Sequence, residues 1–344
     1  GQDGAQNRDR SLMVSPVARG VALALLASGA SAKMWSVSND LELLAAVEYV
    51  NSGDTINLRP GSYNLDKTVT IRNKNNIKVN GKGLATTLNT DGRTRIMQIV
   101  DCQSISINNV VFKDGKVTAS SDQGAVGAGL LVSSSSQVVL TKVTFGTCKS
   151  DALGGGLHFS ESHKCSVSEC SFVGNHAEEG GGGLSAQSCD GISVIDSEFT
   201  GNSARMGAAI AIAQGDGGLV DGCAFNGNQA TDGGAAIEYS TATGLVLTTT
   251  NTFSGNAATA RGDSPPEIHV EGATAVIRSD KGGEVHVQCG PDNPSLMAVR
   301  VGEVAPAEDP EVVVDDDDPE AKGSKHGGKH SGAHGDHAPH AVGA

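Results

Sequence analysis

The sequence predicts an all-β fold, a single-stranded right-handed parallel β-helix in which one chain winds into stacked coils. Two features recur together about every 27 residues. One is a phenylalanine in short elements such as FVGNHA and FTGNSA, found at Phe145, Phe172, Phe199, Phe225 and Phe253. The other is a Gly/Ala run that ends in an aliphatic residue, at Leu130, Leu157, Leu184, Ile210 and Ile237. Because a fixed period with two constant marks is typical of repeat architectures, we expect a solenoid.

The composition of each repeat favours strands over a helical hairpin. The repeats are crowded with Gly, Ser, Thr and Asn, which are poor residues for helix interiors. Apolar residues come in short alternating runs such as Ile105–Ile107 and Ile192–Val194. Three short strands and three turns fill about 27 residues, so residues 56–300 have room for roughly nine coils.

Stacking in register places equivalent residues of successive coils above one another at about 4.8 Å. The phenylalanines then form a buried aromatic stack. The asparagines of the F-x-G-N element form a second column, in which each amide bonds to the residues above and below. We expect this structural ladder at Asn175, Asn202, Asn228 and Asn256.

A short helix at residues 39–50 is predicted to cap the first coil. Asn39 can cap the helix and Glu42 stands three residues later as a capping-box partner. Four apolar residues share one face, Leu43, Leu44, Val47 and Val50. Since an open solenoid end exposes strand edges and core, this helix is the expected lid.

The ends of the chain differ in composition from the β-helix, for which we expect the bounds 33–303. Residues 1–32 are interpreted as an upstream extension and a signal peptide, with Met13, Arg19, an apolar stretch and Ala-Ser-Ala before Lys33. The alternative is a disordered N-terminus of an intracellular protein. The apolar stretch is shorter than the roughly 20 residues that span a bilayer. We therefore expect a secreted or cell-surface protein without a transmembrane segment in its mature chain.

Residues 304–344 are predicted to be a disordered tail. Residues 304–320 contain eight acidic residues and no basic one, including Asp315–Asp318. Residues 321–344 are rich in Gly, Ser and Lys and contain five histidines, His326, His330, His334, His337 and His340. Such a composition cannot bury a core. Clustered imidazoles bind Zn or Cu and the aspartates attract Ca, so weak metal binding by the tail is one hypothesis and a purely solvating tail is the other.

The seven cysteines are expected to be mostly buried and unpaired. Cys170 and Cys223 occupy the same position of the repeat but two coils apart, about 10 Å, which is too far for a disulfide. No two cysteines are one period apart.

The paired motifs resemble the GGA-I and F-x-x-N tetrapeptides that are repeated in the polymorphic outer membrane proteins of chlamydiae. The resemblance covers roughly residues 125–260. The upstream segment SGDTINLRPGSYNL is similar to the opening of pectin-lyase-like β-helices. These resemblances imply stacked coils and a role at the cell surface.

The pectin-lyase-like superfamily contains lyases and hydrolases, so carboxylate pairs are candidate catalytic residues. Alignment of the coils on phenylalanine places Glu169 above Asp196, with Glu198 beside them. Such a pair can serve acid/base catalysis, or it can be an exposed turn where acidic residues are tolerated. Asn89-Thr90-Asp91-Gly92 resembles a polygalacturonase element, but the partner motifs are missing and we interpret it as a turn. The column after the aliphatic anchors, which includes His158, Ser185 and Glu238, is predicted to bring no polar residues together.

Charge and composition bear on the class of partner that the protein binds. A net charge of −14 with 3% aromatic residues argues against nucleic-acid binding. The leading hypothesis is a non-catalytic secreted or surface β-helix with an adhesion, matrix or wall-structural role, whose partners are cell-surface glycans or matrix proteins. It needs no cofactor. The alternative is a polysaccharide lyase or glycoside hydrolase that uses Glu169, Asp196 and Glu198.

Overall fold

The computed structural model describes residues 32–121, 124–248 and 250–259, and strands at 268–271, 274–278 and 284–288. All of them belong to the unit Gly1–Glu303. The expected signal segment, apart from Ala32, and the tail with its histidines lie outside the described residues. Within these ranges no helix has the length and apolar character needed to cross a bilayer.

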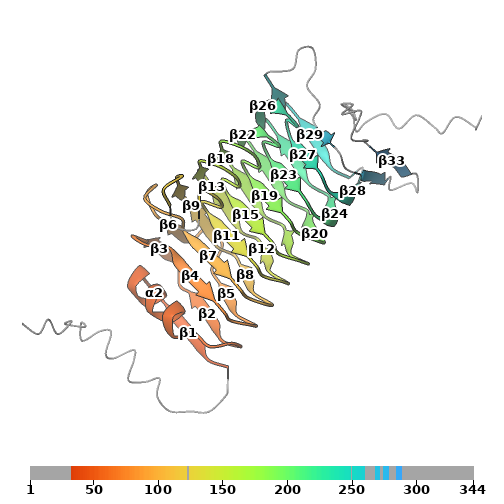
Figure 1. The fold of residues 1–344 in the computed structure, drawn as a ribbon. Coiled ribbons are helices and arrows are strands. Elements are labelled where there is room, and N and C mark those ends of the chain that lie inside the picture. The colour runs from red at the N-terminus through yellow and green to blue at the C-terminus, as the bar shows by residue number, and fades with distance from the viewer. Residues whose placement is uncertain are drawn as a thin grey trace, which may run out of the picture. The chain divides into compact units, whose positions relative to one another are not determined.

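The described chain is a stack of short parallel strands, which Figure 1 shows side by side along the stack. Sheet A contains eleven strands, β1 (Met34–Val37), β2 (Thr55–Leu58), β5 (Lys78–Asn80), β8 (Ser106–Asn108), β12 (Val139–Thr141), β16 (Ser166–Ser168), β20 (Ile192–Ile195), β24 (Asp216–Asp221), β28 (Thr243–Thr248), β32 (Thr274–Arg278) and β33 (Glu284–Gln288). Sheet B contains eight, β3 (Gly61–Asn64), β6 (Thr86–Asn89), β9 (Val111–Lys113), β13 (Thr144–Gly146), β17 (Ser171–Val173), β21 (Glu198–Thr200), β25 (Ala224–Asn226) and β29 (Thr252–Ser254).

Sheet C completes every coil, and sheet D is added in the central coils. Sheet C contains eight strands, β4 (Val69–Arg72), β7 (Met97–Val100), β11 (Leu130–Ser133), β15 (Leu157–Ser160), β19 (Leu184–Gln187), β23 (Ile210–Ala213), β27 (Ile237–Ser240) and β31 (Ile268–Glu271). Sheet D contains six strands of two to five residues, β10 (Lys116–Val117), β14 (Lys149–Ser150), β18 (His176–Ala177), β22 (Ser203–Met206), β26 (Gln229–Gly233) and β30 (Ala257–Ala258).

The architecture confirms a parallel β-helix, with two differences from the expected coil. Each central coil has a fourth strand, in sheet D, where three were expected. The coil number is also slightly lower than nine, because the eight strands of sheets B and C enclose seven complete turns in the described part of the chain. At the C-terminal end of sheet A, β33 pairs with β32 in the antiparallel sense and so adds no further coil.

The capping helix is confirmed as α2 (Asp40–Tyr49). Asn39 is its N-cap and accepts a hydrogen bond from the backbone N–H of Glu42 at 2.9 Å. The Glu42 carboxylate reaches back to the N–H of Ser38, one residue before the cap itself, at 2.8 Å. Leu43 and Val50 are buried, which places the predicted apolar face against the first coil beside β4.

The core contains the expected column of phenylalanines. Neighbouring rings from Phe112 to Phe253 stack with centroid distances of 5.1, 4.9, 4.6, 5.2 and 4.9 Å. Their register follows from strand pairing in sheet B, where each ring lies above the ring of the previous coil. The stack therefore runs through six coils.

The corner between sheets B and D contains the asparagine column. The side-chain oxygens of Asn202, Asn228 and Asn256 each accept both the backbone N–H and the amide N–H of the asparagine one coil before, at 2.9–3.0 Å. The oxygen of Asn175, the first of the column, accepts the backbone N–H of Cys148 at 3.0 Å. Each amide also donates to a carbonyl of the phenylalanine column, as Asn202 does to Phe172 at 2.9 Å. The column thus satisfies the polar backbone where the strands end.

At another corner, cysteine and serine side chains accept backbone N–H groups in the same way. Cys170 Sγ accepts the N–H of Val143 at 3.4 Å, and Ser197 Oγ accepts the N–H of Cys170 at 3.1 Å. All six described cysteines are buried and unpaired with each other, as expected, and the seventh lies outside the described residues. Burial raises the pKa of Cys170 and of Cys223 to about 12, so these thiols are inert.

Candidate functional site

The acidic residues that the coil alignment brought together lie at a corner between sheets A and B. Successive coils place Asn109, Lys142, Glu169, Asp196 and Gly222 at this corner, all with left-handed backbone and φ between 47° and 63°. Glu169, Asp196 and Glu198 are exposed. The corner accepts amide, cation, carboxylate and glycine alike, so its common feature is the backbone conformation.

Glu169 and Glu198 contact neighbouring side chains at the surface. Glu169 Oε2 lies 3.3 Å from Lys142 Nζ, one coil earlier in the same column. Thr200 donates a hydrogen bond to Glu198 at 3.0 Å on the outer face of β21. This is a solvated surface, and none of the three carboxylates lines a groove described below.

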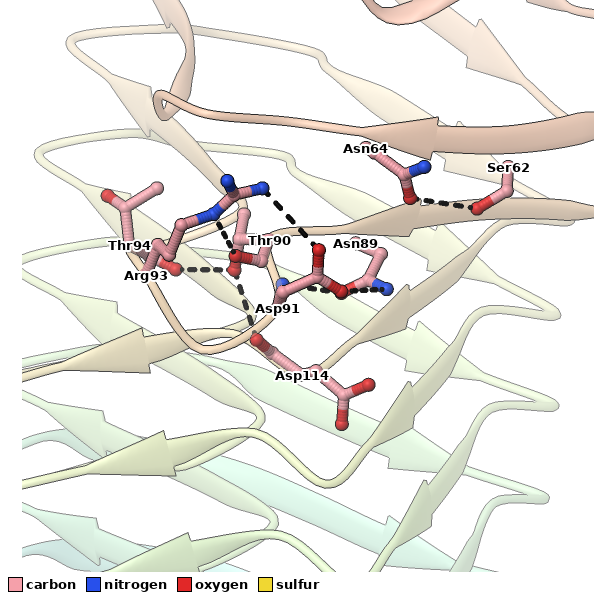
Figure 2. A network of polar contacts seen from close by, with 8 residues as sticks. All are labelled: Ser62, Asn64, Asn89, Thr90, Asp91, Arg93, Thr94 and Asp114. Atoms are coloured by element: carbon pink, nitrogen blue, oxygen red, sulfur yellow. Dashed lines mark hydrogen bonds and ion pairs between the residues drawn. The ribbon is translucent and has the colours of Figure 1, made fainter.

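The Asn-Thr-Asp-Gly segment is a turn, as interpreted from the sequence. Asp91 and Gly92 have φ values of 51° and 71°. Asn89 and Asp91 bond to each other twice, the Asn89 oxygen accepting the Asp91 N–H at 2.7 Å and its amide donating to the Asp91 carboxylate at 2.9 Å. Figure 2 shows these residues closing on one another, with Arg93 folded over the turn.

Neighbouring groups complete this turn. Thr90 is buried and its hydroxyl lies within hydrogen-bond distance of the carbonyl oxygens of Thr94 and Asp114, at 2.8 and 3.0 Å (Figure 2). Arg93 donates to the Thr90 carbonyl at 3.1 Å. The polar groups are thus used to hold the backbone between β6 and the next coil, which is a structural role.

A groove of about 200 Å³ lies where sheet C meets the loops that follow sheet D. Its floor is formed by outward-facing residues of β19, β23 and β27, among them Ser185, Ala211 and Glu238. The opposite wall carries Glu179 and Arg205. A second hollow of about 330 Å³ on the outer face of sheet D also contacts Arg205, so this side chain separates the two.

Arg205 is the central cation of this surface. Its side chain is 48% exposed, and its guanidinium lies 3.2 Å from the Asp232 carboxylate in the next coil. Amide and hydroxyl side chains, Gln187 and Ser240, contribute polar groups to the groove. The arrangement can donate and accept several hydrogen bonds to a polar chain lying across the strands. Nothing periodic in the sequence marks Arg205, since the equivalent positions of other coils hold different residues.

The column after the aliphatic anchors differs from its prediction. His158 Nδ1 lies 2.5 Å from Ser185 Oγ in the next coil, and both side chains are 2% exposed. The expectation of no convergence is wrong for this pair, because Gly-rich turns cover the outer face of sheet C and enclose residues that alternation places outside. Gly127 and Gly154 pack directly on the His158 side chain.

Burial and the charge of Arg95 lower the pKa of His158 to about 3, so the imidazole is neutral near pH 7. Arg95 is itself buried, and its guanidinium donates to the carbonyls of Gly124, Val126 and Gly127 at 2.8–3.2 Å. A base this weak cannot activate the Ser185 hydroxyl effectively. We interpret the pair as a buried structural contact.

The described residues form no metal site of this kind. Among the described residues, no group of three or more His, Cys, Asp or Glu side chains is placed to hold a metal ion. The five tail histidines lie outside these residues, and metal binding there stays a prediction.

The chain is similar to known β-helix proteins. A family model described as a right-handed β-helix region matches residues 128–280, the segment that contains the clearest repeats. No curated protein has a significantly similar sequence. The family match and the parallel coils together show a right-handed parallel β-helix.

Several solved structures are similar to this chain at low identity. A PL6 alginate lyase in complex with a trisaccharide is 14% identical, with a TM-score of 0.47 over 74% of this chain and 60% of that one. ORF18 of Geobacillus virus E2 is 12% identical, with a TM-score of 0.40 over 71% of this chain and 61% of that one. PfbA, a surface adhesin of Streptococcus pneumoniae, is 9% identical, with a TM-score of 0.39 over 70% and 84%. This chain therefore spans less than two thirds of the length of the first two.

Proposed function

We propose that this protein is a non-catalytic, secreted or surface-displayed β-helix that binds cell-surface or matrix glycans along the groove beside Arg205. The observation that carries the proposal is the position of the two carboxylates that the coil alignment places in one column. Glu169 and Asp196 occupy an exposed left-handed corner outside the groove. The groove itself offers the Arg205 guanidinium, the Ser240 hydroxyl and the Gln187 amide, beside the carboxylates of Glu179 and Glu238. These groups can donate and accept hydrogen bonds with a hydroxylated polymer.

Loss of binding in a groove variant tests the proposal. Arg205→Gln should weaken retention on the glycan that the purified wild-type protein binds, by about tenfold, since a charge-assisted hydrogen bond contributes about 1.5–3 kcal/mol. Arg72→Gln is the matched control. Arg72 is also half-exposed and forms an ion pair with a carboxylate one coil away, that of Asp101 at 3.3 Å, but it lies on β4, outside the groove. Equal binding by both variants would contradict the proposed site.

One specific observation favours the enzyme alternative, the adjacency of Glu169 and Asp196 in one column, which follows from the register of the flanking strands. The purified protein should be incubated with pectin, alginate and other uronans, and the release of reducing ends or unsaturated products followed. We expect none. Turnover that disappears in Glu169→Gln or Asp196→Asn would replace the binding role by catalysis.

A further inference from the structure

Asp54 is a buried carboxylate at the N-terminal end of the β-helix. It lies in the turn between α2 and β2 and is 2% exposed. One oxygen accepts the backbone N–H of Lys33 at 2.7 Å. The other accepts the backbone N–H of Asn51 and the indole N–H of Trp35, both at 3.0 Å. Burial acts to raise the pKa of Asp54, but the hydrogen bonds from Asn51, Lys33 and Trp35 outweigh it and hold the pKa below its usual value.

The residue that donates the shortest of these bonds is also the residue that follows the expected signal sequence. Ala30-Ser31-Ala32 has the small-residue pattern of a leader-peptidase site, and the scissile bond joins Ala32 to Lys33. Hydrolysis of this bond adds water, leaves the new carboxyl group on Ala32 and the new amino group on Lys33. At neutral pH that amino group takes up a proton.

We propose that Lys33 is the first residue of the mature protein and that its α-ammonium forms a buried ion pair with the Asp54 carboxylate. The inference rests on the exported role proposed above. The nitrogen involved is the atom that already lies 2.7 Å from Asp54 Oδ1. Cleavage therefore converts a neutral donor into a cation at the same place.

The surrounding backbone holds this nitrogen in position. The Lys33 carbonyl accepts the N–H of Thr55 at 2.8 Å, and the next four residues pair with β2 in register. Because these bonds do not involve the Ala32–Lys33 peptide, cleavage leaves them intact. Exposed Ala32 makes none of these bonds. The proposed ion pair would thus attach β1 to the N-terminal cap through the α-ammonium of Lys33.

The ion pair gives the proposal a pH dependence with a definite sign. Among the described residues, the one charge that acts on Asp54 is the Lys33 side-chain ammonium, and its other partners Asn51 and Trp35 do not titrate. A buried carboxylate raises the pKa of the α-amino group above its ordinary value of about 7.7–8.0. The stabilisation is present where Asp54 is ionised and the pH is below that ordinary value of the α-amino group, and it is lost as the pH rises through the raised pKa.

The first experiment maps the N-terminus of the protein exported by its native host, by N-terminal sequencing. A mature chain that begins at Lys33 supports the proposal. A chain that begins at any other residue overturns it. This result also separates the two levels of inference, because an exported chain with a different terminus leaves the glycan-binding role standing.

The second experiment compares full-length mature chains that begin at Lys33 or at Ala32, each released from a cleavable fusion. The longer chain moves the ammonium about 3.8 Å away and restores the neutral peptide N–H. We expect a higher denaturation midpoint for the chain that begins at Lys33, and an α-amino pKa raised by about one unit or more in its NMR titration. The midpoint difference should disappear in the Asp54→Asn background. Equal midpoints and an ordinary α-amino pKa would overturn the ion pair, and the NMR titration decides even where Asp54→Asn fails to fold.

Discussion

Asn202 donates both its backbone N–H and its side-chain amide N–H to one oxygen of Asn228, each at 3.0 Å. The same relationship joins every neighbouring pair of the column from Asn175 to Asn256. These bonds link successive coils along the axis through side chains, in addition to the backbone hydrogen bonds of the sheets. The column is therefore a continuous buried polar chain at one corner of the apolar core.

The first prediction concerns the interior of this column. Asn202→Leu should lower the free energy of unfolding more than Asn256→Leu, as measured by urea denaturation. Asn202 is fully buried and bonds to both neighbours, so its loss leaves several groups unpaired at about 1–3 kcal/mol each. Asn256, by contrast, is half-buried. Small and equal losses for the two variants would mean that water replaces the column.

The second prediction concerns glycine at the corner before sheet C. Gly181→Ala should be destabilising by several kcal/mol, because φ is +64° and a Cβ would lie 2.3 Å from the Leu184 carbonyl oxygen. Gly201→Ala is the control, since φ is +61° but no atom lies within 4 Å of the added Cβ. That variant should lose only about 1 kcal/mol from the left-handed backbone. Thermal denaturation of both variants measures the difference, and similar losses would contradict the steric argument.

The third prediction concerns acid stability. The pKa of His158 is about 3 in the folded protein, below its ordinary value, so between pH 6.5 and 3 the unfolded chain binds the extra proton. Stability due to this residue should fall by about 1.4 kcal/mol for each pH unit in this range as the pH decreases. His158→Leu should flatten this part of the stability–pH curve, since Leu131 occupies the same column.

His176→Leu is the control for this experiment. His176 Nδ1 makes the same contact with a serine one coil later, Ser203 at 2.9 Å, but its side chain is 38% exposed. This variant removes an exposed imidazole, so comparison of the two variants isolates the effect of burial. Equal slopes for wild type and His158→Leu would contradict burial of a neutral imidazole.

The fourth prediction concerns the tail. Zinc or copper should bind the mature chain more tightly than a version that ends at Val301, because only the former has the five clustered histidines. Affinity should fall as the pH decreases through about 6.5, since the metal needs neutral imidazole. Calorimetric titration of both chains measures this. Identical binding, or none tighter than about millimolar, would leave the tail a solvating role.

The sequence by itself determined the features that repeat along the axis. Constant spacing of Phe172, Phe199 and Phe225 implies vertical neighbours, because in-register parallel strands carry each residue directly above its equivalent. The cap followed from local signals at Asn39 and the apolar face of α2. These features depend on one step length and on short-range chemistry, both of which can be read without coordinates.

Only the tertiary structure decided the contacts between different columns. The groove brings Arg205 of β22 to β19, β23 and β27, and its position depends on how sharply each coil turns after sheet D. The enclosure of His158 depends on Gly-rich turns folding over sheet C, and the bond between Lys33 and Asp54 depends on where the first strand meets the cap. A period specifies the distance along the axis, but these contacts run across the coil, where non-repeating turns set the geometry.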